Sequence, residues 1–351
     1  MDNGFWGLAT GIGSLPHKNA KPALDIIFRY LPEIPHWPQL PAAGEEEGLI
    51  RQYLRPLLER QLVVEAPNRS PYFATNAADW LERLTAFYSE VLAEINPDAS
   101  ADFALPESAA TGFYSFLTHQ LRQPSARYLK GQLVGPVTMG FQVTDDKLQP
   151  AFYQDELRDV LVRTLALQVR WQARTLKSHG LPVLLFIDDP GICGYGQSAF
   201  VGLSREAIQE SLRPLIDAAH DEGVSVGVHA CAGLDWSLLF ELPFDIVNID
   251  VYHYFTSLLL YAAEFNRFLS CGGALAWGLV PTSAQIEQET AETLLDRLAG
   301  YFSLLAKKGV DLELMRKQLL FTPSCGTGTL SEQQAEKVYD LLQQISKQYR
   351  R

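Results

Sequence analysis

The sequence of 351 residues predicts an α/β fold, and within that class a (β/α)8 TIM barrel formed by residues 1–351 as a single domain. Three observations support this prediction. Eight short apolar runs alternate for the most part with stretches in which apolar residues recur at helical spacing. One run, 183–187, is continuously apolar, as expected for a parallel strand buried on both faces. Residues with metal-binding or acid–base chemistry follow several runs, and TIM barrels place their active sites at the carboxyl ends of the strands.

The predicted strands are short apolar runs, and four of the eight end at a proline or an acidic residue. The second run is too rich in proline for a helix, so we expect a short strand with a rigid exit. The eight strands are expected at 8–14, 34–41, 128–136, 183–190, 224–229, 245–250, 273–280 and 318–322.

Helices are predicted between most of these strands. Ser204 is expected to cap one helix, and Ser331 with Gln334 predicts a capping box at the start of the last. Residues 63–126 contain helical patterns but no strand of the βα kind, so we expect a helical insertion over the barrel mouth, between the second and third strands. The helical patterns cover about 22–30, 45–60, 78–95, 107–121, 152–178, 204–222, 236–240, 257–268, 286–307 and the segment after 331.

Composition excludes several classes of protein. A hydrophobic content of 47% allows a large core, and the net charge of −12 argues against a nucleic-acid partner, which needs clustered Lys and Arg. There is no apolar run of about 18 residues and no basic amino-terminal region followed by one, so we expect a soluble, cytoplasmic protein without a membrane partner. Four widely spaced cysteines do not predict a disulfide framework.

Four residues at predicted strand ends have the chemistry of a zinc site. His229 and Cys231 lie two positions apart on one strand, in which side chains alternate between the two faces. Their side chains therefore lie on the same side and can reach one metal ion. Cys325 follows the last strand and Asp250 ends the sixth. Two thiolates, one imidazole and one carboxylate would satisfy tetrahedral zinc.

A structural explanation of these residues has to be weighed against the metal site. A cysteine or a histidine alone is usually a buried core residue. The coincidence of thiols, imidazole and carboxylate at strand ends favours the metal site. Cys193, in a glycine-rich loop, and Cys271, after a helical pattern, have no such neighbours and are expected not to bind metal.

Four motifs in order resemble the catalytic half of cobalamin-independent methionine synthase, within the superfamily that includes uroporphyrinogen decarboxylase. The motifs lie at 12–14, 187–190, 229–231 and 323–326. The run 37–41 is similar to the short, single-domain members of that group. The resemblance extends from residue 8 to residue 330.

The resemblance implies a zinc-dependent methyltransferase that moves a methyl group to the thiol of homocysteine and so makes methionine. It implies zinc held by His229, Cys231, Cys325 and a carboxylate. In the family this carboxylate is a glutamate, whereas the matching position here is Asp250, one methylene shorter. The resemblance also assigns homocysteine binding to a small-residue turn and two acids, which map onto Ile12, Gly13, Ser14, Asp188 and one of Glu45, Glu46 and Glu47, with Glu47 preferred.

The methyl donor is left open because the sequence departs from the family in two ways. A chain of this length is expected to lack the additional amino-terminal barrel of the two-domain enzyme. The segment after the seventh strand, 277–282, also lacks the histidine that the family uses with folate. A methylated corrinoid protein or another small donor therefore fits at least as well as methyl-folate.

Three alternatives share the same residues. A methyltransferase could act on another thiol, such as coenzyme M, with a corrinoid-protein donor. A decarboxylase of the uroporphyrinogen type would need arginines for its carboxylate-rich substrate, whereas this chain places acids after its strands. In the third alternative, zinc only holds the strands of a non-catalytic barrel together.

Overall fold

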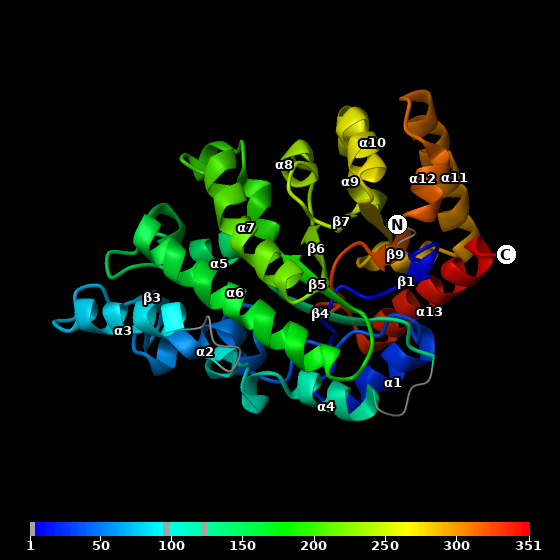
Figure 1. Cartoon of the computed structure of the whole chain (residues 1–351). Coiled ribbons are helices and arrows are strands. Elements are labelled where there is room, and N and C mark those ends of the chain that lie inside the picture. Colours follow the sequence, from blue (N-terminus) through cyan, green and yellow to red (C-terminus); the bar gives the residue numbers. More distant parts are fainter. Residues whose placement is uncertain (1–3, 94–98, 121–124) are drawn as a thin grey trace.

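The computed structural model describes residues 4–93, 99–120 and 125–351. Its centre is a curled, seven-stranded parallel sheet with the strand order β1-β9-β8-β7-β6-β5-β4 (Figure 1). The predicted α/β class is therefore confirmed. The strands are β1 (Leu8–Ala9), β4 (Leu129–Val134), β5 (Val183–Asp188), β6 (Ser225–Ala230), β7 (Ile246–Ile249), β8 (Ala274–Val280) and β9 (Leu319–Pro323).

Helices follow the strands and cover the outer face of the sheet. Ser204 accepts a hydrogen bond from the Ala207 N–H, and Ser331 forms the predicted capping box with Gln334. No helix in the described part of the chain is long and apolar enough to cross a membrane. The α-helices are α1 (Ala20–Tyr30), α2 (Arg51–Glu59), α3 (Trp80–Ala93), α4 (Thr111–Gln120), α5 (Pro136–Gln142), α6 (Asp155–Lys177), α7 (Arg205–Asp221), α8 (Ser237–Phe240), α9 (Val251–Leu258), α10 (Ala262–Ser270), α11 (Ala291–Lys307), α12 (Leu312–Lys317) and α13 (Glu332–Tyr349).

The segment 34–41, predicted as the second strand, is not a regular strand. It makes two isolated parallel bridges, one between Gln39 and Ser14 and the other between His36 and Lys130. It thus lies between the end of β1 and the edge strand β4. Its prolines lack the N–H groups that a continuous ladder requires, which explains why only isolated bridges form.

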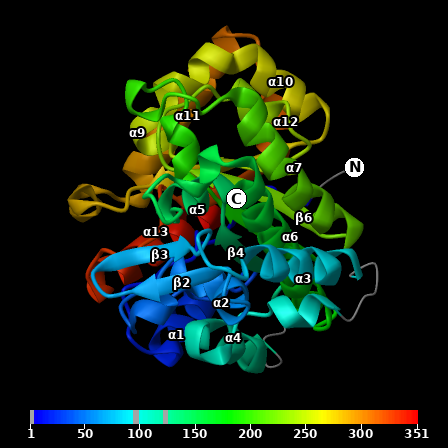
Figure 2. The ribbon, with the colours of Figure 1, turned by 90° about the vertical axis from the view of Figure 1, so that its left-hand side faces the viewer.

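The predicted insertion is not purely helical. Residues 63–126 contain α3 and α4, but they begin with an antiparallel hairpin of β2 (Val63–Ala66) and β3 (Arg69–Phe73). Figure 2 shows this hairpin in the lower half of the view, together with α1 to α4. The missed signal was a short turn in which Asn68 has φ 57°, a conformation that Asn adopts more readily than most residues. The ends of the predicted helices 78–95 and 107–121 extend beyond the described residues.

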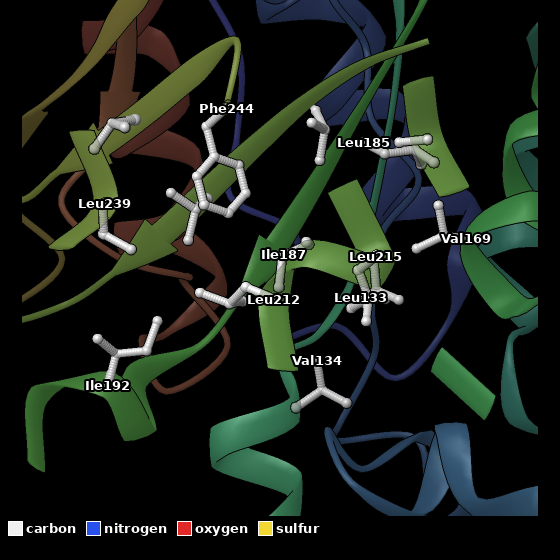
Figure 3. Close-up of a cluster of buried hydrophobic side chains, with 14 of the residues drawn as sticks. Leu133, Val134, Val169, Leu185, Ile187, Ile192, Leu212, Leu215, Leu239 and Phe244 are labelled. Carbon is white, nitrogen blue, oxygen red and sulfur yellow. The ribbon is translucent and has the colours of Figure 1, made fainter. Parts of the chain in front are cut away.

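Two hydrophobic cores lie on the two faces of the sheet. The larger one fills the space between strands and helices, and Figure 3 shows part of it, including Leu185 and Ile187 of β5 and Leu212 of α7. The smaller core contains Leu184 and Phe186 of the same strand and lies inside the curl. Because side chains alternate along a strand, the next inward-facing position after Phe186 is Asp188. Along β5 the inner face thus changes from apolar to polar toward the carboxyl end of the strand.

Candidate functional site

Three of the four predicted metal ligands meet at the carboxyl ends of the strands. Cys231 Sγ lies 2.8 Å from His229 Nε2 and 3.0 Å from Cys325 Sγ. The three ligand atoms all lie within 4.8 Å of one another, so this group could hold a metal ion. His229 lies near the end of β6 and Cys325 follows β9, two strands that are separated in the sheet by β7 and β8. The curl of the sheet therefore brings the two residues together.

Asp250, the fourth predicted ligand, lies outside this group of three. Its Oδ1 accepts a hydrogen bond of 3.0 Å from the His253 N–H, and its Oδ2 lies 2.8 Å from His253 Nδ1. The carboxylate thus caps the start of α9. Among the described residues, the structure brings together three soft or nitrogen donors without this carboxylate.

The two thiols of the group differ in acidity because a hydrogen bond joins them. A hydrogen bond from the Cys231 thiol, together with hydrogen bonding and charge from His229, lowers the pKa of Cys325 to about 4 against the effect of burial. The same hydrogen bond and burial raise the pKa of Cys231. These contacts favour the thiolate of Cys325, which is the form of cysteine that binds metals.

The group opens onto a cavity of about 500 Å³. Its lining includes His229, Cys231 and Cys325 together with four of the residues predicted to bind substrate: Ile12, Ser14, Glu47 and Asp188. Gly13 does not line the cavity. A Cβ at this position would lie 2.8 Å from Gln39 Oε1, so this glycine allows close packing behind the turn.

Asp188 presents an unsatisfied buried oxygen at this cavity. The residue is 6% exposed, and its Oδ1 has no hydrogen-bond partner within the described structure. Burial raises its pKa to about 6, although the charges of Lys130 and His229 oppose the rise. A buried, unpaired carboxylate oxygen is uncommon and indicates a missing partner such as a ligand or water.

The neighbouring acid, Asp189, has a structural role. Its oxygens accept hydrogen bonds from the backbone N–H groups of Val137 (3.0 Å) and Thr138 (2.7 Å) at the start of α5. Burial raises its pKa to about 6. The two adjacent carboxylates therefore face different surroundings, and only Asp188 lines the cavity.

Of the three acids at 45–47, only Glu47 reaches the cavity. It is 3% exposed, and its Oε1 accepts hydrogen bonds from the N–H (2.9 Å) and hydroxyl (2.5 Å) of Thr111. Glu45 and Glu46 instead pair with Arg51 at 3.1 and 2.9 Å, and their side chains are 90% and 44% exposed. The second carboxylate of the cavity is therefore Glu47.

Sequence reasoning missed two buried polar residues of the inner face. Lys130 is fully buried, and its Nζ donates hydrogen bonds to Ile12 O (2.5 Å) and Gln132 Oε1 (3.2 Å). Burial lowers its pKa to about 8, with Asp188 opposing the change. Asn248 is also fully buried and bonds His229. Polar residues within predicted buried strands were the signal that could have identified both.

Comparisons with known proteins do not assign the chain to a family. No family model matches the sequence, and no curated protein matches it. Among solved structures, the crystal structure of dihydropteroate synthase from Thermus thermophilus matches 68% of this chain and 90% of its own chain, with 13% identity and a TM-score of 0.21. A similarity this low carries no argument about the fold or the activity.

Proposed function

We propose that this protein is a zinc-dependent methyltransferase that moves a methyl group to the thiol of homocysteine and makes methionine. The observation that carries the proposal is the joint presence, in one cavity, of the His229–Cys231–Cys325 group and the unpaired Asp188 carboxylate oxygen. The proposal agrees with the motifs that resemble cobalamin-independent methionine synthase.

The donor set suits zinc. Two cysteine sulfurs and an imidazole nitrogen are ligands that zinc prefers, and a site with three protein ligands leaves one position for a substrate. Zinc held there would lower the pKa of a coordinated substrate thiol, so that the thiol would release its proton to solvent and the sulfur would remain nucleophilic without redox chemistry. His229, Cys231 and Cys325 would hold the metal. Asp250, engaged with His253, would support the start of α9 instead.

The acids of the cavity would orient the amino acid. Asp188 Oδ1 would accept a hydrogen bond from the substrate ammonium, with Glu47 adding a second negative charge. The turn at Ile12 and Ser14 would hold the other end of the amino acid, as the resemblance implies. Fixing the acceptor in this way contributes to rate because methyl transfer requires an in-line approach.

The fold that would support this chemistry is a closed (β/α)8 barrel. The seven-stranded sheet is curled, and the segment 34–41 bridges both Ser14 and Lys130. These bridges support the proposal that this segment takes the place of the second strand.

The proposed methyl donor is a methylated corrinoid protein, with a small molecule as the alternative. None of the described residues that line the cavity is a lysine or an arginine. The cavity thus offers no cation for the carboxylates of a folate or of a porphyrinogen. This feature disfavours the decarboxylase alternative as well.

Zinc analysis combined with X-ray absorption at the zinc edge tests the proposal. We expect about one zinc per chain, and homocysteine should add a sulfur ligand to it. Coenzyme M, a thiol without an amine, should bind more weakly because Asp188 would have no ammonium partner. A zinc-loaded protein whose spectrum does not respond to either thiol would favour a purely structural metal. Methyl transfer from methylcobalamin to homocysteine, compared with the Cys325→Ser variant, provides the activity measurement.

A further inference from the structure

The imidazole of His229 has two nitrogens, and only one of them faces the sulfur atoms. Nε2 lies 2.8 Å from Cys231 Sγ, while Nδ1 faces Oδ1 of Asn248. A histidine coordinates a metal through a nitrogen that carries no proton. The chemistry of the group therefore depends on which nitrogen keeps the proton.

The orientation of the Asn248 amide answers this question. Its Nδ2 donates hydrogen bonds to the backbone O of Ala276 (2.9 Å) and to Thr322 Oγ1 (2.6 Å). A backbone carbonyl oxygen can only accept, so the NH2 end of the amide must face Ala276. Oδ1 then faces His229, and an amide oxygen can only accept. Nδ1 must therefore be the nitrogen that donates, which leaves Nε2 for the metal.

Strand register builds this arrangement into the sheet. His229 pairs with Asn248 across β6 and β7, and Asn248 pairs with Ala276 across β7 and β8. The side chains of His229 and Asn248 are 2% and 0% exposed, and Thr322 is also fully buried. Because these side chains are buried, water has little access to His229 Nδ1 and could not take over as its hydrogen-bond acceptor. Loss of the Asn248 amide would therefore leave the buried Nδ1–H without an acceptor.

We propose that Asn248 is a positioning residue that fixes the metal-binding state of His229: its amide, anchored by Ala276 O and Thr322, holds the proton on Nδ1 and directs Nε2 to the metal. The inference rests on the metal centre proposed above. Asn248 touches neither the metal nor the substrate in this assignment. It acts only through His229, as hydrogen-bond partners of metal-binding histidines generally do.

Zinc affinity of the full-length protein tests this inference. In competition with a chromophoric chelator, Asn248→Leu should bind zinc roughly 10- to 100-fold more weakly than the wild type. Asn248→Asp restores an acceptor for Nδ1–H and should bind zinc more tightly than Asn248→Leu. A matched control is Gln172→Leu, which removes another buried amide with hydrogen bonds at both ends. It should lower thermal stability without changing zinc affinity.

A second measurement requires no variant. In zinc-loaded protein labelled with 15N-histidine, we expect His229 to coordinate through Nε2 and to carry its proton on Nδ1. Coordination through Nδ1, or equal zinc affinity of Asn248→Leu and the wild type, would overturn the inference while leaving the metal centre in place. Failure of the wild type to bind zinc would overturn the inference and the proposed function together.

Discussion

The sulfur atoms of Cys231 and Cys325 lie 3.0 Å apart, although 94 positions separate the two residues in the chain. Two strands lie between β6 and β9 in the sheet, so the contact spans its curl. Neither cysteine has a second cysteine nearby in its own segment of the sequence. The candidate metal-binding group is therefore a property of the folded sheet.

We predict that Cys231→Ser and Cys325→Ser each lose most of the bound zinc. A serine hydroxyl is a harder and far less acidic ligand than a thiol, so zinc would keep only two good donors. Metal analysis of the purified full-length variants measures the effect. Cys271→Ser is the matched control, since Cys271 is exposed and should be replaceable without loss of zinc. Full zinc content in either cavity variant would remove that cysteine from the ligand set.

Asp188→Asn should weaken homocysteine binding roughly 10- to 100-fold, because a neutral amide replaces the carboxylate that is proposed to accept a hydrogen bond from the substrate ammonium. Coenzyme M has no ammonium, so its affinity should change little. Isothermal titration of the zinc-loaded variant with each thiol measures both effects.

Asp189, the acid next to Asp188 in the sequence, provides a matched control for this prediction. Asp189→Asn disturbs the hydrogen bonds to Val137 and Thr138, so it should lower the melting temperature while homocysteine affinity is retained. If Asp188→Asn bound homocysteine as well as the wild type, the amine would have to bind elsewhere.

Glu47→Gln should raise the KM for homocysteine several-fold, with roughly a tenfold upper limit, because one of two cavity carboxylates loses its charge. Glutamine retains an oxygen that can accept from Thr111, so the fold should persist. Steady-state kinetics provide the measurement. Glu46→Gln is the control, since Glu46 pairs with Arg51 and does not line the cavity. Equal effects of the two substitutions would contradict the assignment of Glu47.

Acid should destabilise the protein partly through His36. Burial lowers the pKa of this histidine from 6.5 to about 3, with Lys130 adding to the shift. Between these values the unfolded chain takes up a proton that the folded protein excludes. The contribution to stability is thus complete above pH 6.5 and is lost as the pH falls from 6.5 toward 3.

For this one group, the free energy of unfolding should fall by about 1.4 kcal/mol per pH unit in that window. Denaturant unfolding of metal-free wild type and His36→Gln, measured over a series of pH values, isolates the effect as a difference in slope. The two curves should run parallel above pH 7 and converge below it. Parallel curves throughout would show that His36 does not control acid stability.

Local patterns were sufficient for most of the fold. The runs that become β4 to β9 were recognisable because each run is short and its apolar residues are clustered. Stretches in which apolar residues recur at helical spacing separate most of these runs. The caps at Ser204 and Ser331 depend on contacts within four residues, so they too were predictable. The β2–β3 hairpin escaped because its strands are short and carry polar residues.

By itself, the sequence determined the α/β class, the strand that places His229 and Cys231 on one side, and the position of Cys325 at a distant strand end. Only the tertiary structure decided that these three residues meet while Asp250 turns to His253. It also selected Glu47 over its two neighbours and placed Asn248 against His229. The physical reason is that periodicity specifies the face on which a side chain lies, whereas distances between strand ends depend on how the sheet curls.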